Sequence, residues 1–454
     1  MINETITAIA TPIAVGGISV IRISGAEAVS IADKVFNAAS GKPVAEMQGY
    51  TCSYGTVFDG GQPLDDVVLT FFRAPKSYTG EDVVEISCHG GVFITRKILR
   101  VLLENGARLA EAGEFTKRAF LNGKLSLTQA EAVMDLISST GKNELKYAVA
   151  LRDGAIFRRI RAITDDLLEI LGDLAAWADY PEDDIPEVEP SVLLERINGI
   201  IFRLDATGQT YDYGRIIREG INTVIIGKPN VGKSTLMNCL TGFNRSIVTD
   251  IAGTTRDIVE ESVKLGELTL RLADTAGIRN TADIIESMGV DIARKRAEEA
   301  DLILAVFDSS EPLSEDDMEM IRLANGKNAI AILNKSDKQL IGINDFQQYF
   351  KNIVEISAKN YYGIEKLSAC LEEMFIKDEI SAEQGIIANE RQKLCLDNAE
   401  DSLKHAAEAL IMGENLDAVN VLLDEALGFL LQLTGEKVSE AVVDEVFSRF
   451  CVGK

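Results

Sequence analysis

The segment that most constrains this chain runs from Gly227 to Ser234 and reads Gly-Lys-Pro-Asn-Val-Gly-Lys-Ser. It follows the apolar run Val224 to Ile226 and precedes a stretch from Leu236 to Leu240 that is typical of a helix. Glycines at this spacing let backbone N–H groups turn inward around phosphate oxygens at the positive end of a helix. The lysine can reach the β- and γ-phosphates, and the serine hydroxyl can bind Mg²⁺. The segment therefore predicts a P-loop within an α/β nucleotide-binding domain.

Three later motifs indicate which nucleotide binds. Asp274-Thr275-Ala276-Gly277 ends an apolar strand, where its carboxylate can hold Mg²⁺ through water and its glycine N–H can touch the γ-phosphate. Asn334-Lys335-Ser336-Asp337 ends another strand, and its last carboxylate can accept hydrogen bonds from N1–H and the 2-amino group of guanine. Adenine offers neither donor. Ser357-Ala358-Lys359 completes the expected base pocket. In this order behind a P-loop, the motifs predict GTP.

A switch segment is predicted between the P-loop and the strand that precedes Asp274. Residues 249–257 read Thr-Asp-Ile-Ala-Gly-Thr-Thr-Arg-Asp. A threonine hydroxyl here can complete the Mg²⁺ shell only while the γ-phosphate is present, so the loop orders before hydrolysis and is released afterwards. Thr255 is our first choice for this role and Thr254 the second. The competing interpretation is an ordinary polar turn.

The chain lacks one residue that other GTPases use. Ile278 stands where Ras-like enzymes place a glutamine that orients the attacking water. Isoleucine cannot hydrogen-bond a water, so Glu286 is a candidate for that role. Arg256 and Arg279 are local candidates for a cationic finger, although no motif marks either. The side-chain carbonyl of Asn230 can instead coordinate a monovalent cation where the charge of such a finger would lie.

Taken together, these motifs resemble those of the tRNA-modification GTPase family MnmE, also called TrmE. The resemblance covers essentially all 454 residues. Outside the GTPase region it rests on Thr79 to Glu85 with His89-Gly90-Gly91, on Gly113 to Lys124, and on the final Phe450 to Lys454. P-loop GTPases are numerous, whereas this combination of flanking segments is specific to the family.

The resemblance implies a potassium-activated GTPase whose GTPase domains dimerise face to face during hydrolysis. It implies a partner, the flavoprotein MnmG, which carries FAD. Together they would attach an aminomethyl or carboxymethylaminomethyl group to carbon 5 of the tRNA wobble uridine. The one-carbon unit would come from a tetrahydrofolate derivative, either 5-formyl- or methylene-tetrahydrofolate. Whether glycine or ammonia supplies the amine is left open.

The motifs and the resemblance together give a set of expected site residues. The residues expected at GTP are Asn230, Val231, Gly232, Lys233, Ser234, Thr235, Thr249, Asp250, Ile251, Ala252, Gly253, Thr254, Asp274, Thr275, Ala276, Gly277, Asn334, Lys335, Ser336, Asp337, Ser357, Ala358 and Lys359. By resemblance, the Mg²⁺ ligands are Ser234 and Thr255. By resemblance, the K⁺ ligands are the side chains of Asn230 and Thr254 and the backbone of Thr249 and Ile251. The expected catalytic residues are Glu286, Asn230, Thr255 and Cys451. The residues expected at the folate, again by resemblance, are Arg22, Glu85, Lys124 and Lys454.

Two of these positions have competing interpretations. Cys451 is either a small buried apolar residue, the common fate of a free cysteine, or a chemical group near the folate and the target uridine. The terminal Cys-Val-Gly-Lys does not fit a prenylation box, because glycine is not aliphatic and lysine is not a usual last residue. His89, before Gly90-Gly91, is either a structural turn residue or a folate contact.

The net charge of −25 argues against a broad phosphate-binding surface, since nucleic-acid binders usually carry a basic stripe or patch. We therefore expect the basic flavoprotein partner to supply much of the affinity for tRNA. No apolar run is long enough to span a membrane, and Met1 to Glu4 lacks the basic start of a signal peptide. The six cysteines show no Cys-x-x-Cys spacing, so we expect a reduced, cytoplasmic protein.

The expected organisation is a multidomain α/β plus α chain. Residues 1–120 mix β-rich runs and helical stretches as an α+β domain, to which the resemblance assigns folate binding and homodimerisation. Residues 121–218 are helical, residues 219–378 form an inserted doubly wound P-loop GTPase domain, and residues 379–454 are helical again. One discontinuous helical domain is the preferred interpretation, and two separate helical domains are the alternative.

Two apolar stripes at helical spacing support the helical segments. The first comprises Ile160, Ile163, Leu167, Leu171 and Leu174. The second comprises Val419, Leu422, Ala426, Phe429 and Leu433.

Two other classes of GTPase share the nucleotide motifs. A ribosome-assembly GTPase switch usually carries a basic RNA-binding module, and the acidic chain shows none. A membrane-remodelling GTPase with long helical arms would need a basic amphipathic face, which is also missing.

Overall fold

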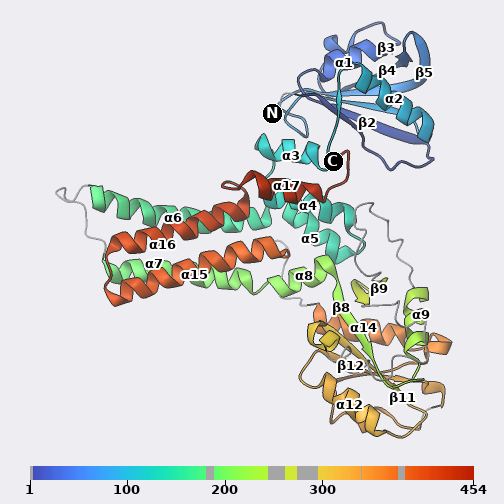
Figure 1. Ribbon diagram of the computed structural model, residues 1–454, viewed down its shortest axis with the longest axis vertical. Helices are drawn as coiled ribbons and strands as arrows, with labels where there is room; N and C mark the ends of the chain where they lie inside the picture. Colours follow the sequence, from blue (N-terminus) through green and yellow to red (C-terminus); the bar gives the residue numbers. More distant parts are fainter. Residues whose placement is uncertain (1–3, 180–188, 244–260, 273–294, 339, 377–383) are drawn as a thin grey trace. The chain divides into compact units, whose positions relative to one another are not determined.

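The computed structural model describes residues 4–179, 189–243, 261–272, 295–338, 340–376 and 384–454 (Figure 1). Within them the chain forms two compact units. The first consists of Met1–Met134, Arg152–Thr164 and Leu427–Lys454, and the second of Asp135–Leu151 and Asp165–Ala426. Each unit therefore joins segments that lie far apart in the sequence.

The first unit is built on a seven-stranded sheet with the order β3-β4-β5-β6-β2-β1-β7. Its strands are β1 (Ile6–Ile9), β2 (Ile18–Ser24), β3 (Phe36–Ala38), β4 (Thr51–Asp59), β5 (Gln62–Phe72), β6 (Val83–His89) and β7 (Arg108–Leu109). Neighbouring strands are antiparallel except β1 and β7, which are parallel. Side chains alternate between the two faces of a strand, so the burial of Ile21 and Ile23 places Arg22 on the opposite face.

Two helices cover one face of this sheet, α1 (Ala28–Val35) and α2 (Val92–Glu104) (Figure 1). Ile31 of α1 and Ile98 of α2 join Ile21, Leu69 and Ile86 of the strands in one apolar core. The first part of the chain is therefore α+β, as predicted.

Helices from both ends of the chain complete the first unit. Leu127 and Ala130, at the start of α4 (Leu127–Ser138), pack with Val443 and Phe447 of α17 (Glu440–Ser448) and with Phe450. In sequence, α3 (Glu114–Leu121) lies between the last strand of the sheet and α4. The C-terminal helix α17 and Phe450 thus pack against α4, a helix that follows the N-terminal sheet in sequence.

A further group of helices flanks the second sheet in sequence. They are α5 (Lys142–Arg152), α6 (Ala155–Asp179), α7 (Pro190–Gly208), α8 (Tyr211–Glu219), α15 (Glu390–Met412) and α16 (Leu416–Thr434). Helix α15 packs along α7, and both bury an apolar stripe (Figure 1). Helices from the two sides of the GTPase segment therefore pack together, which confirms the predicted discontinuous helical domain.

The predicted stripe in α6 needs a correction at one position and that in α16 at two, each time to an adjacent residue. In α6, Leu171 is only half-buried and Ile170 is buried in its place. In α16, Leu422 and Phe429 are half-buried, and the buried positions are Leu423 and Leu430. Adjacent apolar residues make the helical phase ambiguous in the sequence, because spacings of three and four accommodate either neighbour.

The second unit contains a six-stranded sheet with the order β13-β12-β11-β8-β10-β9. Its strands are β8 (Ile221–Ile226), β9 (Glu261–Leu265), β10 (Leu268–Leu272), β11 (Leu302–Asp308), β12 (Ala329–Asn334) and β13 (Asn352–Glu355). All neighbours are parallel except the edge pair β10 and β9. Every residue of β11 and β12 is buried, as expected for central strands covered on both faces.

Helices cover the two faces of this sheet with separate cores. Leu236 of α9 (Lys233–Phe243) and Leu367 of α14 (Ile364–Phe375) belong to one core. Ile321 of α12 (Glu315–Ala324) and Phe346 of α13 (Ile343–Phe346) belong to the other. The predicted doubly wound domain is confirmed.

Across the described residues, none of the helices is both long and apolar enough to cross a lipid bilayer.

Candidate functional site

The predicted P-loop joins the end of β8 to the start of α9. Gly227, Asn230 and Gly232 have positive φ angles of 153°, 64° and 100°. A Cβ atom on Gly227 would lie 2.4 Å from the Val306 carbonyl, and one on Gly232 would lie 2.3 Å from Asn334 Nδ2. The loop can adopt this path only because both positions are glycine, which has no Cβ atom to clash with these neighbours.

Lys233, the first residue of α9, is held by the loop itself. Its Nζ donates to the carbonyl of Gly227 at 2.6 Å and to that of Lys228 at 2.8 Å. Burial lowers the pKa of the Lys233 ammonium, so a nearby anion would favour its charged form. Ser234 and Thr235 follow in the exposed first turn of α9. This turn supplies N–H groups, a hydroxyl and a cation, which are the groups that phosphates and Mg²⁺ require.

Asn334, at the end of β12, connects the P-loop to the predicted base pocket. Its side chain is buried, its Nδ2 donates to the Val231 carbonyl at 2.8 Å, and its Oδ1 accepts from the N–H of Ala358 at 3.1 Å. Next to it, Lys335 Nζ donates to the carbonyl of Asn230 at 3.0 Å and pairs with Asp308. Two adjacent side chains thus hold the P-loop from the side where the base is expected.

Asp337 lies in the short 3₁₀ helix Ser336–Lys338 and is exposed. The hydroxyl of Ser357 donates to its Oδ1 at 2.7 Å. This hydrogen bond is the main reason why the pKa of Asp337 lies below its ordinary value. The carboxylate is therefore an ionised acceptor, as recognition of the two guanine donors requires. Ala358 and Lys359 follow in the turn Ala358–Asn360, beside this carboxylate.

The other predicted residues of the GTP and cation sites lie outside the described residues. They are Thr249, Asp250, Ile251, Ala252, Gly253, Thr254, Thr255, Asp274, Thr275, Ala276, Gly277 and Glu286, together with the arginine candidates Arg256 and Arg279.

A second cluster lies on the open face of the first sheet. Arg22 on β2 and Glu85 on β6 are directly opposite in register, with Nε to Oε1 at 2.8 Å. The Arg22 guanidinium lies 5.5 Å from the ring centre of Phe115 and 5.8 Å from that of Tyr78. It also donates to the carbonyl of Gly453 at 3.3 Å. An arginine held by a carboxylate and two rings is rigid and keeps donors free for a further acceptor.

The C-terminal residues reach the same place. Val452 forms an antiparallel bridge with Ala112, and the N–H of Phe115 donates to the carbonyl of Lys454 at 3.1 Å. Burial, with the nearby Arg22 charge, lowers the pKa of the Lys454 ammonium. Arg22, Glu85 and Lys454, which the family resemblance assigned to one folate site, therefore lie close together.

Lys124, the remaining residue predicted at the folate, contacts the loop between β5 and β6. Its Nζ donates to the carbonyl of Pro75 at 3.0 Å, and Asn122 Nδ2 donates to that of Thr79 at 2.7 Å. The same loop carries Tyr78, which lies at Arg22. Lys124 thus helps to hold the loop that supplies part of the cluster.

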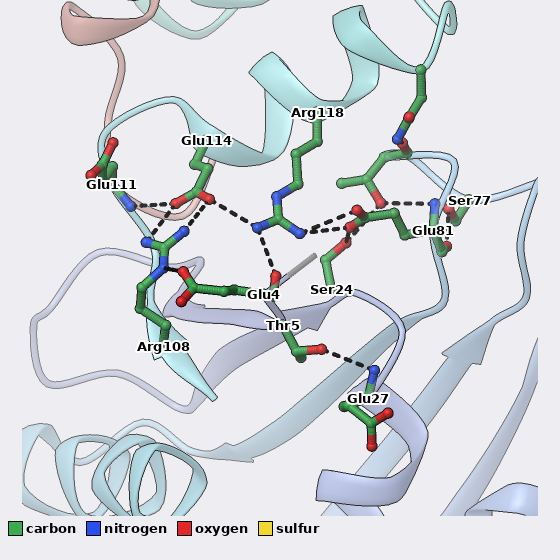
Figure 2. Close-up of polar contacts among 12 residues, drawn as sticks. Glu4, Thr5, Ser24, Glu27, Ser77, Glu81, Arg108, Glu111, Glu114 and Arg118 are labelled. Atoms are coloured by element: carbon green, nitrogen blue, oxygen red, sulfur yellow. Dashed lines mark hydrogen bonds and ion pairs between the residues drawn. The ribbon is translucent and has the colours of Figure 1, made fainter. Parts of the chain in front are cut away.

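An ionic network centred on the buried Arg118 escaped the sequence analysis (Figure 2). Arg118 of α3 is 3% exposed; its Nη1 lies 3.1 Å from both carboxylate oxygens of Glu81, and its Nη2 lies 2.9 Å from Glu114. Arg108 pairs with Glu114 and with Glu4. Burial raises the pKa of Glu114, but the hydrogen bonds from Arg108 and Arg118 outweigh it, so the pKa lies below its ordinary value. The spacing of Glu114 and Arg118, four residues apart on a helix, was the signal that could have found this pair.

Cys451 and His89 are both exposed. The exposed Cys451 thiol does not fit the interpretation of a buried packing residue, while its backbone carbonyl accepts from the N–H of Gly113 at 3.4 Å. Both the N–H and the ring Nδ1 of His89 bond to the Asp65 carboxylate, at 2.8 and 2.6 Å. These bonds tie the end of β6 to β5 and favour the structural interpretation of His89.

Comparison with known proteins gives consistent matches over the whole chain. The family model described as "GTP-binding protein TrmE N-terminus" matches residues 5–124, and that described as "MnmE helical domain" matches residues 127–451. The chain is 42% identical over 462 residues to the "tRNA modification GTPase MnmE" of Carboxydothermus hydrogenoformans, covering 100% of both chains. It is 42% identical over 461 residues to the protein of the same name from Acetivibrio thermocellus, covering 100% of this chain and 99% of the relative. Among solved structures, a variant of Aquifex aeolicus Era bound to GDP and AlF4⁻ is 29% identical, with coverage of 40% of this chain and 66% of that one and a TM-score of 0.27.

Proposed function

The chain belongs to the family of tRNA modification GTPases named MnmE, and from this premise we propose that it is a potassium-dependent GTPase that modifies the tRNA wobble uridine. It acts with the flavoprotein MnmG, which carries FAD. The pair attaches an aminomethyl or carboxymethylaminomethyl group to carbon 5 of the base. A tetrahydrofolate derivative supplies the one-carbon unit.

The observation that carries the GTP part of the proposal is the position of Asn334. Its amide joins Val231 of the P-loop to Ala358, next to the Ser357 hydroxyl that orients Asp337. Phosphate-binding and base-binding groups are therefore held in one rigid frame. Ser234 and Thr255 hold Mg²⁺ in this proposal, and the ion neutralises charge that develops on the phosphates. Of these two residues, Ser234 lies in the described part of the chain, where its exposure in the first turn of α9 suits a metal ligand.

Potassium dependence draws support from Asn230. This residue is exposed, has a φ of 64° and has its backbone fixed by Lys335. A side chain fixed at its base beside the phosphate loop is suited to offering its carbonyl oxygen to a cation, together with Thr249, Ile251 and Thr254. A bound K⁺ supplies positive charge where an arginine finger would act. Glu286 orients the attacking water.

The folate part of the proposal rests on the cluster of Arg22, Glu85 and Lys454. A tetrahydrofolate has a ring with N–H donors and a tail with carboxylates. Glu85 offers an acceptor to the first, and the two cations suit the second. Tyr78 and Phe115 add aromatic faces at the same place. In this proposal the exposed thiol of Cys451, in the same C-terminal segment as Lys454, acts on the one-carbon unit.

The expected partners follow from charge and from the family. A net charge of −25 makes the chain a poor electrostatic binder of tRNA by itself. We assign most of the tRNA affinity to the flavoprotein, and homodimerisation to the N-terminal domain. The place of action is the cytoplasm.

A reconstitution with purified components tests the proposal. The protein, MnmG, GTP, a tetrahydrofolate derivative and tRNA are combined, and the wobble uridine is analysed by mass spectrometry. Modification should require GTP and should not occur with ATP. In matched buffers, GTP hydrolysis should be faster in KCl than in NaCl because the smaller ion does not fit the same oxygen ligands. Equal rates in the two salts, or a preference for ATP, would contradict the proposal.

An Asn230→Lys variant is the specific test of the cation site. A tethered ammonium would take the place of the ion, so the difference between KCl and NaCl should largely disappear. A variant that stays fully potassium-dependent would remove Asn230 from the site.

A further inference from the structure

Lys228, the second residue of the P-loop, makes contacts that none of the nucleotide motifs explains. Its Nζ lies 2.9 Å from Asp317 Oδ2 and 3.4 Å from Ser314 Oγ. The Lys228 side chain is 13% exposed and that of Asp317 is 3% exposed. The P-loop is thereby joined through a nearly buried ion pair to the first turn of α12.

Asp317 is itself fixed by the start of that helix. Ser314 and Asp317 form a capping box: Asp317 Oδ2 accepts from the N–H of Ser314 at 2.9 Å and from its hydroxyl at 2.7 Å. The other oxygen, Oδ1, is buried without a partner among the described residues. Burial raises the pKa of Asp317, but the bonds from Ser314 and Lys228 outweigh it, so the pKa lies below its ordinary value. A buried, ionised carboxylate with one unpaired oxygen depends on the ammonium of Lys228 for compensation of its charge.

The backbone carbonyl of Lys228 makes a second contact, within the P-loop itself. Its carbonyl accepts from Lys233 Nζ at 2.8 Å, beside the Gly227 carbonyl at 2.6 Å. Lys233 is the ammonium expected to reach the β- and γ-phosphates. Lys228 therefore bonds to α12 through its side chain and to the phosphate-binding lysine through its main chain.

A second lysine, Lys335, holds the P-loop at its centre, at Asn230. Lys335 Nζ donates to the carbonyl of Asn230 at 3.0 Å and pairs with Asp308. The attachment by Lys335 belongs to the base-recognition motif. The attachment by Lys228 comes from a helix that carries no nucleotide motif.

We propose that Lys228 is a positioning residue for GTP binding and hydrolysis, which works by fixing the first turn of the P-loop to the capping box of α12 through Asp317. It does not touch the nucleotide. It holds the carbonyls that align Lys233, so its loss lets the loop and the ammonium sample other positions. This inference rests on the GTPase function proposed above.

The test uses the full-length protein with Lys228→Met, Lys228→Arg, Asp317→Asn and the Lys228→Met/Asp317→Asn double variant. Affinity is measured with fluorescent mant-GDP and mant-GTP, kcat and KM by steady-state GTP hydrolysis in KCl, and thermal stability without nucleotide. Lys351→Met, an exposed lysine in the same domain, is the matched control. Lys228→Met should weaken mant-GTP binding about tenfold, because the loop is no longer held in its binding conformation before the nucleotide arrives. Lys228→Arg should stay near wild type because a guanidinium can reach the same carboxylate.

The double variant separates positioning from stability. It removes the uncompensated charge that Lys228→Met leaves buried, so thermal stability should return towards wild type. The tether is still absent, so mant-GTP affinity should stay low. Recovery of both stability and affinity would overturn the inference, as would normal affinity in Lys228→Met. If the wild-type protein itself failed to bind GTP, the proposed function would fall, and this inference with it.

Discussion

Arg22 and Gly453 are joined by a hydrogen bond across 431 residues of sequence, from Nη1 of the arginine to the glycine carbonyl at 3.3 Å. The same guanidinium pairs with Glu85 and lies over two aromatic rings. The last residues of the chain therefore lie at a charged cluster on the N-terminal sheet. A substitution of Arg22 should therefore loosen the C-terminal segment.

Replacing Arg22 by Gln should release the C-terminal segment and abolish binding of tetrahydrofolate. Loss of the pair leaves Glu85 partly buried without its hydrogen-bonded partner Arg22, at a cost of about 1–3 kcal/mol. Hydrogen exchange of the peptide 450–454 should become faster, while GTP hydrolysis stays unchanged. Arg100→Gln is the control, because Arg100 and Glu104 form an ion pair whose side chains are 70% and 50% exposed. Unchanged exchange of the C-terminal peptide would show that the Gly453 contact does not hold it.

Replacing Cys451 by Ser should stop tRNA modification and leave GTP hydrolysis and thermal stability near wild type. The thiol is exposed, so serine neither opens a cavity nor buries a hydroxyl. The measurement is the mass of the wobble uridine after a reconstituted reaction, with Cys52→Ser, another exposed cysteine, as the control. Full modification by the Cys451 variant would exclude a chemical role for the thiol.

Replacing Gly232 by Ala should break the hydrogen bond by which Asn334 joins the P-loop to the base pocket. A Cβ atom there would lie 2.3 Å from Asn334 Nδ2, so the amide must leave the Val231 carbonyl. Gly326 has a similarly positive φ of 75° but no atom within 4 Å of its Cβ position. Gly326→Ala therefore carries the backbone strain without the clash. Gly232→Ala should lose nucleotide affinity by about tenfold or more, while Gly326→Ala loses only stability, about 1 kcal/mol. Equal affinities in titrations with mant-GDP would show that the clash is relieved without moving Asn334.

The GTPase motifs could be placed from the sequence because each stands directly after a strand, and the ends of parallel strands meet at one edge of a sheet. Asn334, Asp337 and Ser357 accordingly lie together. The cluster at Arg22 was assembled in advance only by family resemblance. Residue spacing alone gives no sign that Gly453 reaches β2, since the intervening chain includes another complete domain. Tyr78 and Phe115 likewise carry no local pattern that marks them as partners of an arginine.

The limits of periodicity are clearest in the helices. Leu171 and Ile170 are adjacent and both apolar, so either residue fits an apolar face at helical spacing. The structure buries Ile170, whereas Leu171 lies four residues after Leu167 and three before Leu174 and fits the same spacing rule equally well. The same choice recurs at Leu423 and Leu430 in α16.

The hairpin of β9 and β10 offers a route from the nucleotide to the helices. In sequence it lies between the predicted switch segment and the Asp274 motif. Within the second unit, its residues contact the start of α5: Thr269 Oγ1 bonds to Glu144 Oε1 at 3.2 Å, and Glu267 Oε2 accepts from the N–H of Lys142 at 3.1 Å. Any displacement of the hairpin on hydrolysis therefore acts directly on a helix.

Replacing Glu267 by Gln together with Glu144 by Gln should weaken this link without touching the P-loop. GTP hydrolysis should remain within about twofold of wild type, and GTP-dependent tRNA modification should fall about fivefold or more, the range of a coupling energy between two sites. The two rates are measured on the same preparation, with Lys351→Met as the control because that lysine is exposed and remote from α5 in sequence. A variant whose modification and hydrolysis rates fall in the same proportion would place the hairpin in the hydrolysis step. One that keeps both rates would show that nucleotide-dependent motion reaches the helices by another path.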